Sequence, residues 1–248
     1  MLVSKKFIPS LFTILNAFCG FLSIVHASNG EYDSAAMFII YATLFDLFDG
    51  FVARLLKTSS DFGVELDSLS DVISFGAAPS YLLYAIFFKP YGGIGIVLSS
   101  LVMVFSAIRL ARFNVELVGH DKEKFQGLPT PITSIALCSY LLYYHNKIFD
   151  IDLSSKLIFI LAILLPLLMV SRFNYFTLPK INKKSFRKNI HIFIILFISI
   201  VIIAVTKGEA LFFFSILYVI SGIISTILKI IFKKKPPKPK IKAETSFT

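Results

Sequence analysis

The stretch at positions 46–54 reads D-L-F-D-G-F-V-A-R, and the stretch at 63–71 reads G-V-E-L-D-S-L-S-D. Together they place four aspartates inside otherwise apolar sequence: Asp46, Asp49, Asp67 and Asp71. Carboxylates are costly near a bilayer core, so four of them need a compensating partner. Ligand sets made only of oxygen favour hard cations such as Mg²⁺, Mn²⁺ or Ca²⁺. The pattern therefore predicts a metal-dependent active site at a membrane surface.

The composition around this stretch is that of an integral membrane protein. Of the 248 residues, 56% are hydrophobic and only 16% are charged, whereas about 25% are charged in ordinary soluble domains. Apolar runs of about 20 residues predict an all-α membrane protein with about eight transmembrane helices, at 7–27, 34–56, 68–88, 92–112, 129–147, 154–171, 190–206 and 208–232. We expect residues 1–232 to form one transmembrane domain, with its catalytic core in about 1–190, and residues 233–248 to form a basic, disordered cytoplasmic tail.

The basic residues predict the orientation of these helices. If the N-terminus is cytoplasmic, all but four of the 25 Lys and Arg residues fall on the cytoplasmic side, the exceptions being Lys89, Lys147, Lys156 and Lys207. The positive-inside rule then places both termini and the aspartates at the cytoplasmic face of a cell membrane. The net charge of +10 is thereby explained as an orientation signal and an attraction to anionic lipid, without a nucleic-acid partner.

Helical spacing brings the aspartates together. Asp46 and Asp49 are three residues apart on one predicted helix, and Asp67 and Asp71 are four apart on the next, so each pair shares a helix face. A short turn at 57–61 lets the two helices lie antiparallel, with four carboxylates converging. Two divalent cations would cancel the four charges, and a two-metal site is the usual clamp for displacement at phosphorus.

Several neighbours suit a phosphate-containing substrate. Gly50 and Gly63 remove side chains where a substrate must approach the backbone. Arg54 offers a guanidinium to phosphate oxygens, and Ser60 offers a hydroxyl. The same acidic residues would also suit a different class of protein, a divalent-cation transporter with a carboxylate-lined pathway.

The combined pattern D-x2-D-G-x2-A-R-x8-G-x3-D-x3-D resembles the signature of the CDP-alcohol phosphotransferases. The resemblance implies a membrane fold whose active site opens to the cytoplasm and holds two Mg²⁺ or Mn²⁺ ions, with Ca²⁺ as a substitute. It implies that one ion is held by Asp46, Asp49 and Asp67, and the other by Asp46, Asp67 and Asp71. It further implies that Asp71 is the general base and that Gly50, Arg54, Ser60 and Gly63 hold the CDP-lipid.

Other segments resemble the membrane-embedded phosphatidylserine synthases within that family, at positions 9–20, 67–79, 109–114 and 125–131. This resemblance implies transfer of a phosphatidyl group from CDP-diacylglycerol to L-serine, giving phosphatidylserine and CMP. A zwitterionic acceptor needs a cation for its carboxylate, and Arg109 or Arg112 could supply it, with Asn114 beside them. Both arginines would equally serve as membrane anchors. Glycerol 3-phosphate or inositol phosphate stays open as the acceptor, and so does a homodimer.

Overall fold

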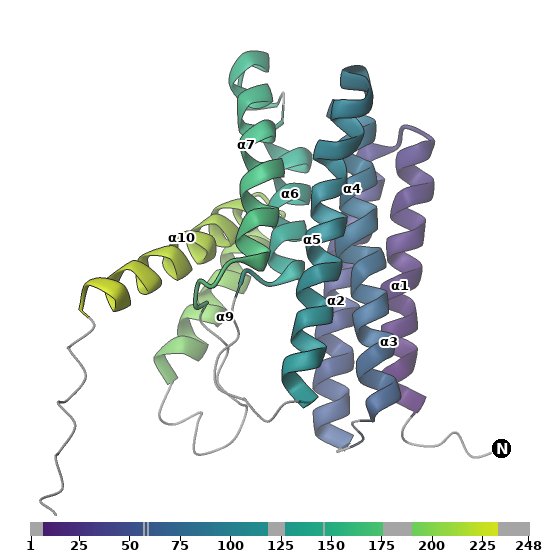
Figure 1. Ribbon diagram of the computed structural model, residues 1–248, viewed down its shortest axis with the longest axis vertical. Helices are drawn as coiled ribbons and strands as arrows, with labels where there is room; N and C mark the ends of the chain where they lie inside the picture. Colours follow the sequence, from purple (N-terminus) through teal and green to yellow (C-terminus); the bar gives the residue numbers. More distant parts are fainter. Residues whose placement is uncertain are drawn as a thin grey trace, which may run out of the picture.

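The computed structural model describes residues 7–56, 58, 60–118, 127–145, 147–175 and 190–232. Every element in these residues is helical. The predicted tail at 233–248 lies outside them, as do the first two residues of the 125–131 segment. Figure 1 shows a bundle of upright helices, with α9 and α10 set at an angle beside it.

The first half of the chain forms the part of the bundle that carries the aspartates. Helix α1 (Phe7–Ser28) packs along α2 (Tyr32–Leu56). Close contact is allowed by small side chains on α2, because Ala35, Ala36 and Ala42 are buried in the core and small residues let membrane helices approach. Helix α3 (Asp61–Asp71) then returns antiparallel to α2 and contacts α1.

Helix α3 runs on through segments of changing pitch. A π-helical turn at Val72–Ala77 leads into α4 (Ala78–Leu83), a second π-helical turn at Tyr84–Phe88 and a 3₁₀ turn at Lys89–Tyr91. Gly92, with φ of 56°, then reverses the chain into α5 (Gly92–Val118). The first π-helical turn begins directly after Asp71, and such turns are frequent at functional sites.

The remaining helices pack against this half. They are α6 (Thr130–Tyr143), α7 (Ile151–Val170), α9 (Ile190–Val205) and α10 (Ala210–Ile231). On α6, Ser134 donates a hydrogen bond of 2.8 Å to the carbonyl of Phe75, within the π-helical turn. The altered pitch of that turn is thus supported by a side chain from a neighbouring helix.

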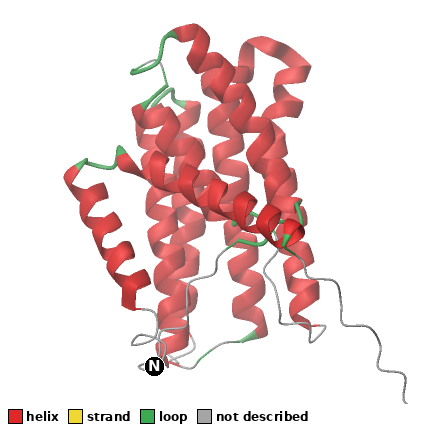
Figure 2. Ribbon diagram, turned by 90° about the vertical axis from the view of Figure 1, so that its left-hand side faces the viewer, coloured by secondary structure: helices red, strands yellow, loops and turns green. Residues whose placement is uncertain are grey.

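Helix α10 crosses the bundle obliquely (Figure 2). It is fastened to the segment after α7, where the N–H of Asn174 donates to Thr226 Oγ1 at 2.9 Å and the ring of Tyr175 stacks on that of Tyr218. The Tyr175 ring lies so close to Gly222 that a Cβ there would overlap it. Burial raises the pKa of Tyr175 to about 12.

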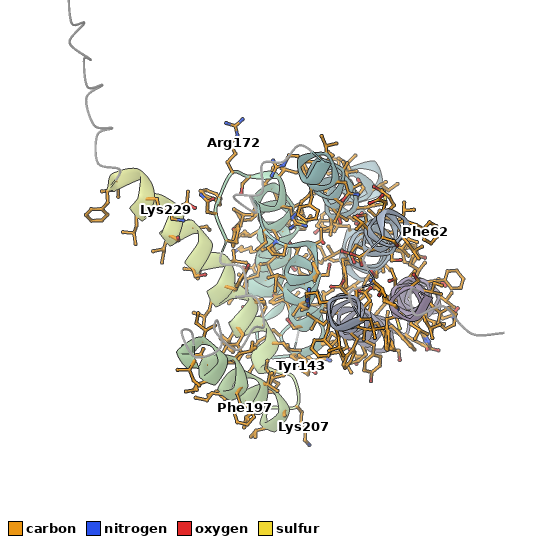
Figure 3. All side chains as sticks on the ribbon, turned by 90° about the horizontal axis from the view of Figure 1, so that it is seen from below. Phe62, Tyr143, Arg172, Phe197, Lys207 and Lys229 are labelled. Atoms are coloured by element: carbon orange, nitrogen blue, oxygen red, sulfur yellow. The ribbon has the colours of Figure 1, made fainter. Side chains whose placement is uncertain are left out.

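Across the described residues the structure confirms an all-helical fold, with several apolar helices suited to a multi-pass membrane protein. Five described helical stretches are long and apolar enough to cross a membrane, one of which, Asp61–Val115, contains the reversal at Gly92. Helices at Thr130–Tyr143 and Ile194–Val205 are apolar but shorter. The count of eight spans and the cytoplasmic termini stay predictions. Large apolar side chains such as Phe197 point outward from the bundle (Figure 3), as lipid-facing residues would.

Candidate metal and substrate site

Three of the four aspartates converge between α2 and α3. Asp46, Asp49 and Asp67 each offer a carboxylate oxygen, and these oxygens lie within 4.8 Å of one another. Asp49 is buried, while Asp46 and Asp67 are half-buried. The Oδ1 atom of Asp67 is buried and has no hydrogen-bond partner among the described residues. Carboxylates gathered this closely repel one another, so a cation that binds several of them at once would stabilise the cluster.

Asp71 lies one helical turn beyond Asp67, deeper in the bundle. Its side chain is almost fully buried, and it interacts electrostatically with Asp46, Asp67 and Asp49. It is not part of the three-residue cluster. The predicted convergence of four carboxylates therefore appears as a tight group of three with the fourth close behind it.

Helix α1 contacts the acidic residues directly, which the sequence did not lead us to expect. Thr13 donates a hydrogen bond of 2.9 Å to Asp49 Oδ2, and Asn16 Nδ2 donates one of 3.2 Å to Asp71 Oδ1. Both polar residues are buried, and they are three residues apart on one helix face. Two buried polar residues at helical spacing in an apolar segment were the signal that could have identified them.

A pocket opens beside the cluster, on the side of the turn between α2 and α3. It is lined by Pro9, Ser10, Thr13, Asp49, Gly50, Ala53, Thr58, Ser60, Gly63, Val64 and Asp67. The predicted substrate residues Gly50, Ser60 and Gly63 thus share one pocket with two of the clustered aspartates. Arg54 adjoins it, because its guanidinium lies over Gly50, where a Cβ would be 3.4 Å from Nη1.

Ser60 also has a structural role. It is the N-cap of α3, and its hydroxyl oxygen accepts a hydrogen bond of 3.1 Å from the N–H of Gly63. A cap of this kind fixes where the helix begins. Its hydroxyl proton remains available as a donor to a ligand in the pocket.

The three predicted acceptor residues on α5 differ in their surroundings. Arg112 Nη1 donates to the carbonyl of Val170 on α7 at 3.4 Å. The side-chain amide of Asn114 bonds to Ser68 and Glu65 on α3. Arg109, in contrast, interacts electrostatically with Asp71, and its buried Nε has no hydrogen-bond partner in the described part of the chain. Among these interactions, an aspartate of the site appears as a partner of Arg109.

Comparisons with known proteins agree with this site. Residues 6–178 match the family described as CDP-alcohol phosphatidyltransferase. A CDP-diacylglycerol–serine O-phosphatidyltransferase of Helicobacter pylori is 38% identical over 229 residues, covering 91% of this chain and 94% of that protein. A protein of the same name from Methanocaldococcus jannaschii is 35% identical over 215 residues, covering 87% and 92% respectively. An archaetidylserine synthase of Methanothermobacter thermautotrophicus is 42% identical over 141 residues, covering 54% and 58%.

The family match spans α1 to α7, and therefore every residue of the acidic cluster and the pocket. The family is metal-dependent, and the cluster of Asp46, Asp49 and Asp67 could hold a metal ion. The family match, the identity to relatives over most of the chain and the geometry of the site all support the same family assignment. This chain belongs to the CDP-alcohol phosphatidyltransferase family of membrane-embedded phosphotransferases.

Proposed function

We propose that the protein transfers the phosphatidyl group of CDP-diacylglycerol to the hydroxyl of L-serine, giving phosphatidylserine and CMP. The proposal is carried by the clustered carboxylates of Asp46, Asp49 and Asp67 beside a pocket, in a chain 38% identical to a named serine phosphatidyltransferase over nearly its full length. Relatives with this name and the archaetidylserine synthase both use serine as the alcohol. The serine acceptor is therefore favoured over glycerol 3-phosphate and inositol phosphate.

The donor set fits divalent metal. We assign Asp46, Asp49 and Asp67 to one ion and Asp46, Asp67 and Asp71 to a second, with Mg²⁺ or Mn²⁺ as the ions. Oxygen ligands of this kind suit such hard cations. Asp67 Oδ1, which is buried and has no partner among the described residues, would gain one in a bound cation. Bound there, divalent metal would stabilise negative charge that develops on the phosphoryl and leaving-group oxygens.

The chain's own residues bind the donor and move the proton. Gly50 and Gly63 leave room for the diphosphate against the backbone, while Arg54 and Ser60 donate hydrogen bonds to it. Asp71 takes the proton from the serine hydroxyl. The hydroxyl oxygen of serine meanwhile forms a bond to the phosphorus nearest diacylglycerol. The bond from that phosphorus to the bridging oxygen breaks, and CMP leaves with the electron pair.

The expected placement in the membrane follows from the distribution of the basic residues. The positive-inside pattern favours an active site that faces the cytoplasm, where the CDP headgroup of the donor and free serine would be in contact with water. The acyl chains of the donor would stay in the bilayer beside the outward-facing apolar side chains. The homodimer stays a prediction.

The test is an acceptor panel with purified protein in lipid nanodiscs. CDP-diacylglycerol and Mn²⁺ or Mg²⁺ are supplied with L-serine, glycerol 3-phosphate or inositol phosphate, and CMP release and lipid product are measured. We expect CMP and phosphatidylserine with serine alone. Product with another acceptor in place of serine would reassign the substrate, and metal flux without CMP release would instead support a transporter.

A further inference from the structure

Two residues that interact with Asp71 each carry a buried polar atom without a partner among the described residues. One atom is Oδ1 of Asn16 on α1, and the other is Nε of Arg109 on α5; neither has a hydrogen-bond partner within the described residues. Asn16 is completely buried and bonded to Asp71 through Nδ2, while Arg109 interacts electrostatically with Asp71. Buried polar groups are nearly always satisfied, so two unpaired atoms on residues that interact with Asp71 point to a ligand.

The free atoms have opposite hydrogen-bonding character. Asn16 donates to Asp71 Oδ1 through its amide nitrogen, which leaves its amide oxygen as an acceptor. The guanidinium of Arg109 has only donors and carries a fixed positive charge. Asp71 thus interacts with one residue that offers a free acceptor and one that offers a cationic donor.

L-Serine has the complementary groups. Its ammonium needs an acceptor, its carboxylate needs a cationic donor, and its hydroxyl must reach the base. We propose that Asn16 and Arg109 form the amino-acid subsite of this enzyme: Asn16 Oδ1 accepts from the ammonium, and Arg109 binds the carboxylate. The hydroxyl then lies at Asp71. This subsite rests on the proposed function and narrows it, because it selects Arg109 over Arg112 and adds a residue of α1.

A three-point subsite has consequences that need no mutation to test. Ethanolamine has the hydroxyl and ammonium but no carboxylate, and 3-hydroxypropionate has the hydroxyl and carboxylate but no ammonium. Either would leave a buried polar group of the protein unpaired, and sites built to bind a polar group reject analogues that lack it, here by about 10²-fold or more in kcat/KM. D-Serine can satisfy only two of the three contacts at once and should be similarly poor.

The first experiment is this acceptor series on the full-length wild-type protein in nanodiscs, with CDP-diacylglycerol and Mn²⁺, following CMP release. Strong rejection of all three analogues supports the subsite. If serine is used but ethanolamine or 3-hydroxypropionate is used within about threefold of it, the subsite is overturned while the serine function stands. If serine itself gives no CMP, the proposed function fails and the subsite fails with it.

Substitutions of Asn16 and Arg109 test which residue contacts the ammonium and which contacts the carboxylate of serine. Asn16→Leu should lower the rate with every acceptor, because Asp71 loses its partner, but it should lower the rate with serine most. The preference for serine over 3-hydroxypropionate should therefore fall by about tenfold or more. Arg109→Lys, which keeps the charge but loses the planar fork, should raise the KM for serine and leave the KM for CDP-diacylglycerol unchanged.

Ser23→Ala is the matched control, since Ser23 is buried on α1 and also has no partner among the described residues. It should leave all acceptor ratios as in wild type. An Asn16→Leu protein that keeps its full preference for serine over 3-hydroxypropionate would show that Asn16 only supports the fold or Asp71, and would overturn its role in binding the ammonium.

Discussion

Thr13 on α1 donates a hydrogen bond of 2.9 Å to Asp49 on α2, and both residues are buried. Helix α1 carries no acidic residue of the cluster, yet it holds one of the carboxylates in place. Because the same helix also reaches Asp71 through Asn16, the orientation of two acidic side chains depends on how α1 packs.

The first prediction follows from this contact. Thr13→Val keeps the side-chain shape but removes the donor, at a cost of about 1 kcal/mol for one hydrogen bond. We expect the Mn²⁺ concentration for half-maximal activity to rise by about fivefold, since Asp49 is no longer fixed toward Asp46 and Asp67. Titration of CMP release against Mn²⁺ measures this shift.

A control for that substitution is available on α2. Thr43 is buried and donates only to the carbonyl of Ile39 in its own helix, among the bonds described. Thr43→Val should leave the Mn²⁺ dependence unchanged. An equal shift in both variants would mean that the effect is general loss of packing and not loss of the contact with Asp49.

The second prediction concerns how closely α1 approaches the π-helical turn. A Cβ added to Gly20 would lie 2.7 Å from the Cα of Ser74, so a backbone must move. We expect Gly20→Ala to separate α1 from that turn, to draw Asn16 away from Asp71, and to lower both the melting temperature and the turnover. Gly93→Ala, where a Cβ meets nothing within 4 Å, should change neither by comparison.

The sequence sufficed for some of these features and not for others. The spacing of the aspartates predicted a cluster on adjacent helices because helical geometry alone determines which residues share a face. It could not separate Asp71 from the other three, since that depends on where α3 lies against α1 and α5. The π-helical turn after Asp71 was missed for the same reason. The carbonyl of Phe75 in that turn accepts a hydrogen bond from Ser134, which is far away in sequence.

The acceptor residues show the same limit. Arg109 and Arg112 are three residues apart and looked equivalent as cations at the end of one helix. The interactions described distinguish them, because Arg112 donates to the carbonyl of Val170 while Arg109 interacts electrostatically with Asp71. Span lengths were also less regular than hydropathy suggested, since α6 ends at Tyr143 and is shorter than the expected 129–147.

A third prediction addresses the metal. Asp46 is assigned to both ions, so Asp46→Ala should reduce bound Mn²⁺ below the wild-type amount and abolish CMP release.

Wild-type protein should lose activity on treatment with a chelator and regain it with Mn²⁺. Added Mn²⁺ should also raise its melting temperature, because a ligand that binds only the folded state stabilises it. Metal content by mass spectrometry and thermal melts measure both effects. An Asp46→Ala protein with normal metal content would contradict the shared role.

The last prediction separates proton transfer from donor binding. Asp71→Asn keeps the size of the side chain and can still pair with Asn16 through its amide oxygen, but it cannot take a proton from the acceptor. A positioned base contributes about 10²–10⁴-fold to rate, so turnover should fall by that order while CDP-diacylglycerol still binds. Competition binding with a labelled CDP-lipid, run beside the CMP assay, distinguishes the two steps. Because Asp71 is also assigned to the second ion, the assay is repeated at saturating Mn²⁺. If turnover then returns to near the wild-type rate, Asp71 acts as a metal ligand and another group must accept the proton.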